Sequence, residues 1–124
     1  MSKTPDSAKI GIVGCGKVGM TAAYALLMQA VPNELVLVGR SKDDLVGEQL
    51  DLEHGLNFLH PAKITSTDNY ADLAGADVVI FTAGAAQQPG QTRLDLAAAN
   101  IKIMSNIIPE VLKYAPETII LMVT

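Results

Sequence analysis

The feature that most constrains this chain is a glycine-rich turn, Gly14-Cys15-Gly16-Lys17-Val18-Gly19, which follows directly on the apolar run Ile10 to Val13. The apolar run predicts a buried strand, and the helical stretch Lys17 to Gln29 comes after it. A glycine-rich turn between a strand and a helix is a dinucleotide-binding signature. We therefore expect all six residues of the turn to contact a dinucleotide cofactor.

The three glycines of the turn have separate tasks in such a site. Gly14 permits the tight turn, Gly16 lets the backbone approach a pyrophosphate, and Gly19 lets the helix pack closely on the strand. The N-terminus of that helix presents free N–H groups and a partial positive charge, which favour phosphate. Cys15 is best explained as a small residue in a tight turn rather than a reactive thiol.

The rest of the chain continues to alternate strands and helices, which predicts an α/β fold. Continuous apolar strands are typical of a parallel sheet that is covered on both faces. We expect a Rossmann-type sheet of about five strands, truncated, with residues 1–124 forming one partial domain, because no linker or repeat divides them. The predicted strands are Ile10 to Val13, Glu34 to Val38, Ala62 to Ser66, Asp77 to Thr82 and Thr118 to Val123. The predicted helices are Lys17 to Gln29, about Lys42 to Leu59, and Thr92 to Tyr114, with a short helix or turn at Asn69 to Gly75.

Three residues further define the ends and the continuity of the predicted helices. Ser41 is the expected N-cap of the helix from Lys42, and Pro61 ends that helix. Pro109 is expected to kink or split the long helix from Thr92, because proline removes a backbone donor.

Composition excludes several function classes. A formal net charge of -4 gives no indication of nucleic-acid binding. Glycine, glutamine or charged residues interrupt the apolar stretches before they reach membrane-spanning length, and residues 1–9 do not have the pattern of a signal peptide. A single cysteine excludes an internal disulfide framework and agrees with a cytoplasmic location.

The end of the second predicted strand indicates which dinucleotide is used. An acidic residue about 20 positions after the glycine turn normally binds the adenosine ribose. This chain has Gly39 there, followed by Arg40 and Ser41. Glycine removes a charge that would repel a 2′-phosphate, and an adjacent arginine can bond to the phosphate oxygens. The residues predict that NAD or NADP is bound, with NADP favoured; the alternative is that Arg40 is a solvated cation.

Three motifs together closely resemble the lactate and malate dehydrogenase family. The first is the glycine turn. The second is Gly47-Glu48-Gln49-Leu50-Asp51-Leu52-Glu53-His54-Gly55 on the second helix, and the third is the loop Ala83 to Leu96. The resemblance extends from Lys9 to Thr124. It implies an NAD(P)-dependent 2-hydroxy acid dehydrogenase that acts on a small 2-oxo or 2-hydroxy acid.

The resemblance assigns the substrate side of the site. It implies that Arg93 polarises the substrate carbonyl, which agrees with the stabilisation of a developing alkoxide by a guanidinium group. It places Gln87 where malate enzymes have arginine and lactate enzymes have glutamine. A neutral amide cannot neutralise a second carboxylate, so pyruvate is favoured over oxaloacetate. Malate dehydrogenase remains the alternative within the family.

Four further residues are assigned to the cofactor. Thr82, Ala83 and Gly84 follow a central strand at its carboxyl end, where ligands bind in open parallel sheets. Val123 resembles a position near the nicotinamide. For these residues simple packing is the competing interpretation.

Neither histidine is assigned a catalytic role, and no metal site is expected. Glu53-His54-Gly55 belongs to the second-helix motif, which the family uses in subunit contact, rather than to the catalytic element that it superficially resembles. His60 is explained as a helix-end residue. The spacing of the two histidines does not fit a metal pair on one helix face.

The family's proton-donor histidine, its partner aspartate and a substrate-binding arginine are all expected beyond Thr124. We therefore expect the 124 residues alone to have little or no turnover. The alternative to an oxidoreductase is a stand-alone nucleotide-binding or assembly module without catalysis. An unpaired sheet edge and an apolar helix face further predict a homo-oligomer.

Overall fold

A computed structural model of the chain describes residues 8–56 and 61–124. Its centre is a five-stranded, entirely parallel sheet in the order β3-β2-β1-β4-β5. The strands are β1 (Lys9–Val13), β2 (Glu34–Val38), β3 (Lys63–Thr67), β4 (Val78–Phe81) and β5 (Ile119–Met122). The helices are α1 (Lys17–Met28), α2 (Lys42–Gly55) and α3 (Arg93–Tyr114), with a 3₁₀ turn η2 (Tyr70–Leu73). This is the predicted Rossmann-like architecture.

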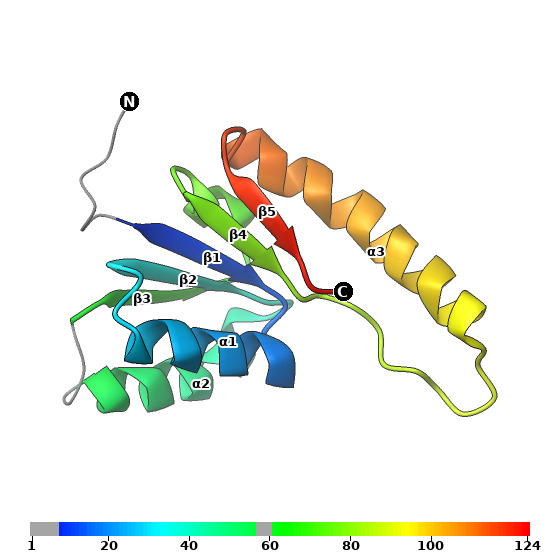
Figure 1. Ribbon diagram of the computed structural model, residues 1–124, viewed down its shortest axis with the longest axis horizontal. Helices are drawn as coiled ribbons and strands as arrows, with labels where there is room; N and C mark the ends of the chain where they lie inside the picture. Colours follow the sequence, from blue (N-terminus) through cyan, green and yellow to red (C-terminus); the bar gives the residue numbers. More distant parts are fainter. Residues whose placement is uncertain (1–7, 57–60) are drawn as a thin grey trace.

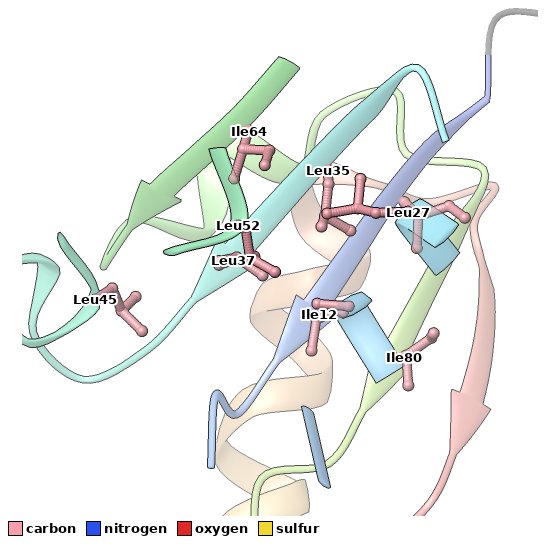
Figure 2. Close-up of a cluster of buried hydrophobic side chains, with 10 residues drawn as sticks. Ile12, Leu27, Leu35, Leu37, Leu45, Leu52, Ile64 and Ile80 are labelled. Atoms are coloured by element: carbon pink, nitrogen blue, oxygen red, sulfur yellow. The ribbon is translucent and has the colours of Figure 1, made fainter. Parts of the chain in front are cut away.

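The helices form one layer on each face of the sheet. In Figure 1, α1 and α2 lie side by side on one face, and α3 lies on the other. The two layers have separate cores, because alternate residues of each strand point to opposite faces. Leu35 and Leu37 of β2 pack toward α1 and α2, whereas Val36 and Val38 pack toward η2 and α3. Figure 2 shows the first of these cores, with Leu45 and Leu52 of α2 facing the strands.

Two helix predictions need adjustment. The second helix was predicted to run to about Leu59, but α2 ends at Gly55, directly before Leu56. Leu59 and His60 lie outside the described residues. The prediction for Pro109 was a kink or a split, and the split is wrong, because α3 is one continuous helix with Pro109 inside it. A proline removes one backbone bond, and packing of Val111 and neighbouring side chains against the sheet holds the helix together across it.

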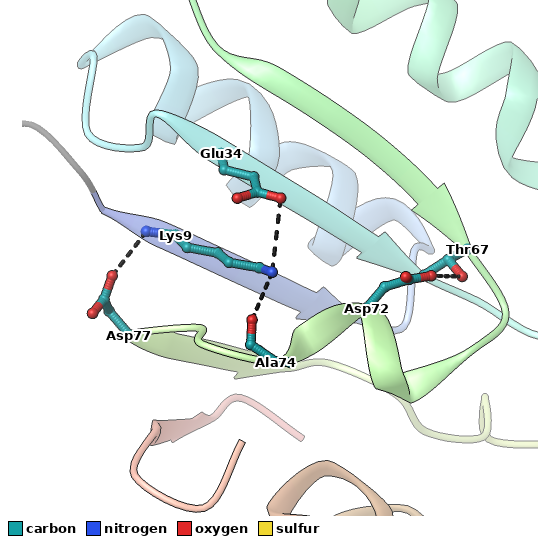
Figure 3. Close-up of polar contacts among 6 residues, drawn as sticks. All are labelled: Lys9, Glu34, Thr67, Asp72, Ala74 and Asp77. Carbon is teal, nitrogen blue, oxygen red and sulfur yellow. Dashed lines mark hydrogen bonds and ion pairs between the residues drawn. The ribbon is translucent and has the colours of Figure 1, made fainter. Parts of the chain in front are cut away.

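Polar contacts join three strands at their amino ends, opposite the site described below. The Lys9 backbone N donates to Asp77 at 2.9 Å, and Lys9 Nζ donates to the carbonyl of Ala74 at 2.7 Å. The same Nζ lies 3.7 Å from Glu34 Oε1, as Figure 3 shows. These contacts align the amino ends of β1, β2 and β4.

Two neighbouring hydroxyls on β3 allow a stability prediction. Ser66 Oγ is buried and has no hydrogen-bond partner among the described residues. Thr67 Oγ1 donates to Asp72 at 2.5 Å (Figure 3) and accepts from the Asn69 backbone N at 3.0 Å. We expect Ser66→Ala to raise the free energy of unfolding by about 1 kcal/mol, because it removes an unsatisfied polar group. Thr67→Val should lower it by about 1 to 3 kcal/mol.

Urea denaturation of the two variants beside the parent measures both effects. Each substitution removes one hydroxyl from a buried position of the same strand, so each is the control for the other. A lower unfolding free energy for Ser66→Ala would contradict the assignment of an unsatisfied hydroxyl.

Candidate dinucleotide site

A cavity of about 540 Å³ opens at the carboxyl ends of β1, β2 and β4. It lies where the strand order reverses: successive strands β2 and β3 are added on one side of β1, and β4 and β5 on the other. Ligands of open α/β sheets bind at such a switch point. The cavity is lined by Val13, Gly14, Cys15, Gly16, Val38, Gly39, Arg40, Ser41, Leu45, Glu48, Tyr70, Thr82, Ala83, Gly84, Ile103, Asn106 and Ile107.

The glycine turn is packed against the end of β4. Gly14 has a φ of 94°, and a Cβ added there would lie 2.6 Å from the Ala83 Cα. A Cβ at Gly19 would overlap the Gly14 carbonyl and lie 2.9 Å from Thr82 Oγ1. A Cβ at Gly16 would meet no atom within 4 Å. Gly14 and Gly19 therefore permit packing, whereas the Gly16 backbone faces open space at the cavity.

Thr82 connects the end of β4 to this turn. Its hydroxyl donates to the Gly14 carbonyl, and its backbone N donates to the Val13 carbonyl at 2.8 Å. Ala83 and Gly84 continue from Thr82 along the cavity wall. The structure thus brings together two segments that are separated by about seventy residues in the sequence.

The segment after β2 forms another part of the wall. Gly39 N donates to the Thr67 carbonyl at 3.1 Å, which continues the pairing of β2 with β3 by one residue. Arg40 is exposed at the cavity, and Ser41 is half-buried at the N-cap position of α2. The Ser41 side chain makes no capping hydrogen bond. Arg40 and Ser41 therefore offer a cation and a hydroxyl beside the N-terminus of a helix.

Sequence reasoning missed eight residues of the wall, two of which, Val13 and Val38, end the strands β1 and β2. Three more are Leu45 and Glu48 of α2 and Tyr70 of η2; the others are Ile103, Asn106 and Ile107 of α3. The last three have the spacing of one helical face, but their sequence does not reveal that this face meets the cavity. Burial, together with the charge of Glu110, raises the pKa of the Tyr70 phenol above its ordinary value. Tyr70 therefore stays protonated at neutral pH.

Four predicted cofactor residues do not line this cavity. Gly19 is buried beneath the turn, and Val18 is exposed on α1. Lys17 lines a neighbouring hollow that shares Cys15, Gly16 and Glu48 with the cavity. Val123 is exposed after β5, and its backbone N donates to the Phe81 carbonyl at 3.0 Å.

Cys15 has the environment of a structural thiol. Its Sγ lies 3.6 Å from the Val38 carbonyl, to which it donates. Burial, with a smaller contribution from the charge of Glu48, raises its pKa to about 11. The group is therefore a neutral thiol at physiological pH, whereas reactive cysteines have a lowered pKa.

The predicted substrate residues lie outside the cavity lining, Gln87 in the loop between β4 and α3 and Arg93 at the start of α3. Gln87 is exposed, and its Nε2 donates to the Gln91 carbonyl at 2.9 Å. Arg93 is the exposed first residue of α3, directly after the N-cap Thr92. Thr92 and Asp95 form a capping box, whose hydrogen bonds lower the pKa of Asp95. The helix start that carries Arg93 is thus well defined.

Across residues 8–56 and 61–124, no three His, Cys, Asp or Glu side chains lie together as metal ligands would. None of the described helices combines the length and apolar character of a membrane span.

Comparison with known proteins gives one consistent result. Residues 8–124 match a family model described as lactate/malate dehydrogenase, NAD binding domain. An L-lactate dehydrogenase of Clostridium botulinum (strain Langeland) is 48% identical over 124 residues, which are 100% of this chain and 39% of that protein. An L-lactate dehydrogenase of Thermoanaerobacterium saccharolyticum is 44% identical over 94% of this chain and 37% of its own. This chain therefore spans about two fifths of the length of the curated relatives it matches.

Solved structures agree with the sequence relatives. The crystal structure of minor L-lactate dehydrogenase from Enterococcus mundtii in the ligands-bound form has a TM-score of 0.88 and 40% sequence identity. The match covers 94% of this chain and 37% of that one. A lactate dehydrogenase from a Medee basin deep-sea metagenome library has a TM-score of 0.86 and 35% identity, with the same coverage.

Proposed function

Because this chain belongs to the lactate/malate dehydrogenase family, as its NAD-binding domain, we propose that it is the cofactor-binding part of an L-lactate dehydrogenase-like oxidoreductase. The proposed reaction is NAD(P)-dependent interconversion of pyruvate and lactate. One observation carries the proposal: Gly14 to Gly16 of the glycine turn and the Gly39-Arg40-Ser41 segment line the same cavity, at the switch point of the sheet.

The residues present fit a dinucleotide along the whole cavity. The open space at Gly16 and the N-terminus of α1 suit a pyrophosphate. The apolar wall suits an adenine ring; it comprises Val38, Leu45, Tyr70, Ile103 and Ile107. The backbone of Thr82, Ala83 and Gly84 would border the nicotinamide end. When bound, the nicotinamide supplies or accepts the hydride.

The proposed preference for NADP rests on Arg40. A 2′-phosphate on the ribose would meet the guanidinium group and the Ser41 hydroxyl, with no carboxylate at position 39 to repel it. We expect Arg40→Gln to weaken NADPH binding by roughly 10- to 100-fold, because hydrogen bonds to charged groups contribute about 1.5 to 3 kcal/mol. NADH binding should stay within about twofold. Fluorescence titration of both reduced cofactors measures the two affinities.

Lys63→Gln is the matched control for this experiment. It removes the same charge from an exposed position at the amino end of β3, whereas the cavity lies at the carboxyl ends. It should leave both affinities unchanged. Tighter binding of NADH than NADPH by the parent would overturn the preference for NADP, and binding of neither cofactor would overturn the dinucleotide site.

On the substrate side, we propose that Arg93 stabilises the negative charge that develops on the substrate oxygen during hydride transfer. Gln87 would then select a monocarboxylic 2-oxo acid, since an amide cannot neutralise a second carboxylate. Comparing pyruvate with oxaloacetate in the enzyme that contains this domain tests Gln87. A higher kcat/KM for oxaloacetate would favour malate dehydrogenase instead.

The second candidate function is a nucleotide-binding or assembly module without turnover. It is favoured by the position of His54, which lies exposed in the last turn of α2 and not at the cavity. We propose that the 124 residues alone bind cofactor but do not oxidise it with pyruvate. A steady-state assay of this chain, with its intact mass verified, decides between binding alone and catalysis.

We further propose a homo-oligomer in the cytoplasm. Exposed apolar side chains on the outer surfaces of α1 and α2 support association; they include Tyr24, Met28, Val46 and Leu50. The edge strand β5 also exposes Ile119 and Leu121. The cytoplasmic setting is supported by the single cysteine of the sequence.

A further inference from the structure

The loop between β4 and α3 is held at its beginning by a side chain of α3. Asn100 Oδ1 accepts a hydrogen bond from the Ala85 backbone N at 2.9 Å. A Cβ at Gly84 would lie 3.1 Å from the same oxygen and 3.1 Å from Thr124 Cγ2. Thr124 Oγ1 donates to the Ala83 carbonyl at 2.7 Å. Asn100 and Thr124 thus hold the three residues Ala83 to Ala85 in place by hydrogen bonds. We call these three residues the loop stem.

The tip of the same loop is closed by its own hydrogen bonds. Besides the bond from Gln87 to the Gln91 carbonyl, Gln88 N donates to Gln91 Oε1 at 3.0 Å, and Gln91 N donates to the Gln88 carbonyl at 3.0 Å. Gly90 completes this turn with a φ of 83°. The hydrogen bonds of the tip share no residue with those of the stem, and the exposed Ala86 separates the two parts.

We propose that Asn100 is a positioning residue that fixes the loop stem against the cavity, so that any rearrangement of the loop on substrate binding begins after Ala85. The inference rests on the proposed function, in which Ala83 and Gly84 border the nicotinamide and Gln87 and Arg93 meet the substrate. Asn100 is half-buried and lies two turns into α3, so its side chain has a fixed support. Its oxygen accepts the hydrogen bond of the Ala85 backbone N–H, which would otherwise need water as its partner.

This arrangement separates two requirements of the loop. The stem borders the cofactor and must keep one conformation while the tip moves. A side-chain acceptor from a helix achieves this, because it holds Ala85 without adding a strand or a further loop contact. Gly84 is the residue that lets Asn100 approach so closely.

The test compares ligands that do and do not reach the stem. Asn100→Leu keeps the size of the side chain and removes the acceptor, whereas Asn100→Asp keeps an acceptor oxygen. We expect Asn100→Leu to weaken NADPH binding about three- to tenfold, as loss of one hydrogen bond predicts. Binding of 2′,5′-ADP, which lacks the nicotinamide end, should stay within about twofold, and Asn100→Asp should restore NADPH binding. Hydrogen exchange of the Ala85 amide should be faster in Asn100→Leu than in the parent.

Ser105→Leu, at an exposed position of the same helix, is the control for helix composition. Equal weakening of both ligands by Asn100→Leu would indicate general destabilisation and overturn the positioning role. Unchanged exchange of the Ala85 amide would overturn it too, and Gly84→Ala gives an independent second variant, since it displaces the Asn100 oxygen. If the parent binds neither ligand, the proposed dinucleotide site fails, and the exchange measurement still decides the role of Asn100.

Discussion

Gly19→Ala is expected to lower the free energy of unfolding by more than about 3 kcal/mol, because its Cβ would overlap the Gly14 carbonyl. A clash with backbone cannot be relieved by a change of rotamer, so α1 would have to move away from the turn. Gly14→Ala should be comparably damaging. Its φ of 94° disfavours any L side chain, and its Cβ would press on the backbone of Ala83. Thermal and urea denaturation measure both losses against the parent.

Gly16→Ala is the matched control within the same turn. Its Cβ would have no atom within 4 Å, so the variant should unfold at nearly the temperature of the parent. Its affinity for either dinucleotide should nevertheless fall by roughly tenfold or more, because the methyl group would occupy the space proposed for the pyrophosphate. A folded Gly16→Ala variant with normal affinity would show that the pyrophosphate lies elsewhere.

Gly39→Asp is expected to reverse the proposed preference for NADPH over NADH. The carboxylate would repel the 2′-phosphate of NADPH and accept hydrogen bonds from the ribose hydroxyls of NADH. We expect NADPH affinity to fall by roughly 100-fold and NADH affinity to rise by roughly tenfold, since hydrogen bonds to a charged group contribute about 1.5 to 3 kcal/mol each. The new Cβ would lie 3.0 Å from Leu45 Cδ1, the end of a flexible side chain that can shift slightly. The variant should therefore remain folded.

Gly47→Asp supplies the control for Gly39→Asp. It introduces the same side chain on α2, where a Cβ would meet nothing within 4 Å, and Gly47 does not line the cavity. Titration of both variants with NADH and NADPH separates a local effect at the ribose from a change in net charge. An unaltered ratio of the two affinities in Gly39→Asp would contradict the placement of the adenosine ribose beside residue 39.

Much of the fold was predictable because its signals are local. The β2 strand has the predicted bounds Glu34–Val38, and β1 begins one residue earlier than predicted. Apolar runs of this length, separated by helical stretches, leave little choice other than a parallel sheet. The continuity of α3 across Pro109 could not be predicted from local signals. Pro109 weakens one hydrogen bond, but the packing that maintains the helix involves residues far away in the sequence.

Some residues of the candidate site could likewise be predicted from the sequence, and others could not. The positions of Gly14 to Gly16, Gly39 to Ser41 and Thr82 to Gly84 at one cavity could be predicted, because each segment follows a strand and all parallel strands end at the same edge of the sheet. Tyr70 and the α3 residues Ile103 and Ile107 could not. Their contribution depends on the angle at which η2 and α3 cross the sheet, and no local pattern encodes that angle.

The sequence by itself determined the order of the elements, the family and the backbone positions where only glycine fits, because strand periodicity and turn chemistry act over a few residues. Only the tertiary structure decided which face of α3 lines the cavity. It also decided that Gly14 and Gly19 pack against the end of β4, and that Asn100 forms a hydrogen bond to the loop stem. These features join residues between about 15 and 70 positions apart. Such contacts exist only after the sheet has assembled, since packing in three dimensions and not local preference brings the partners together.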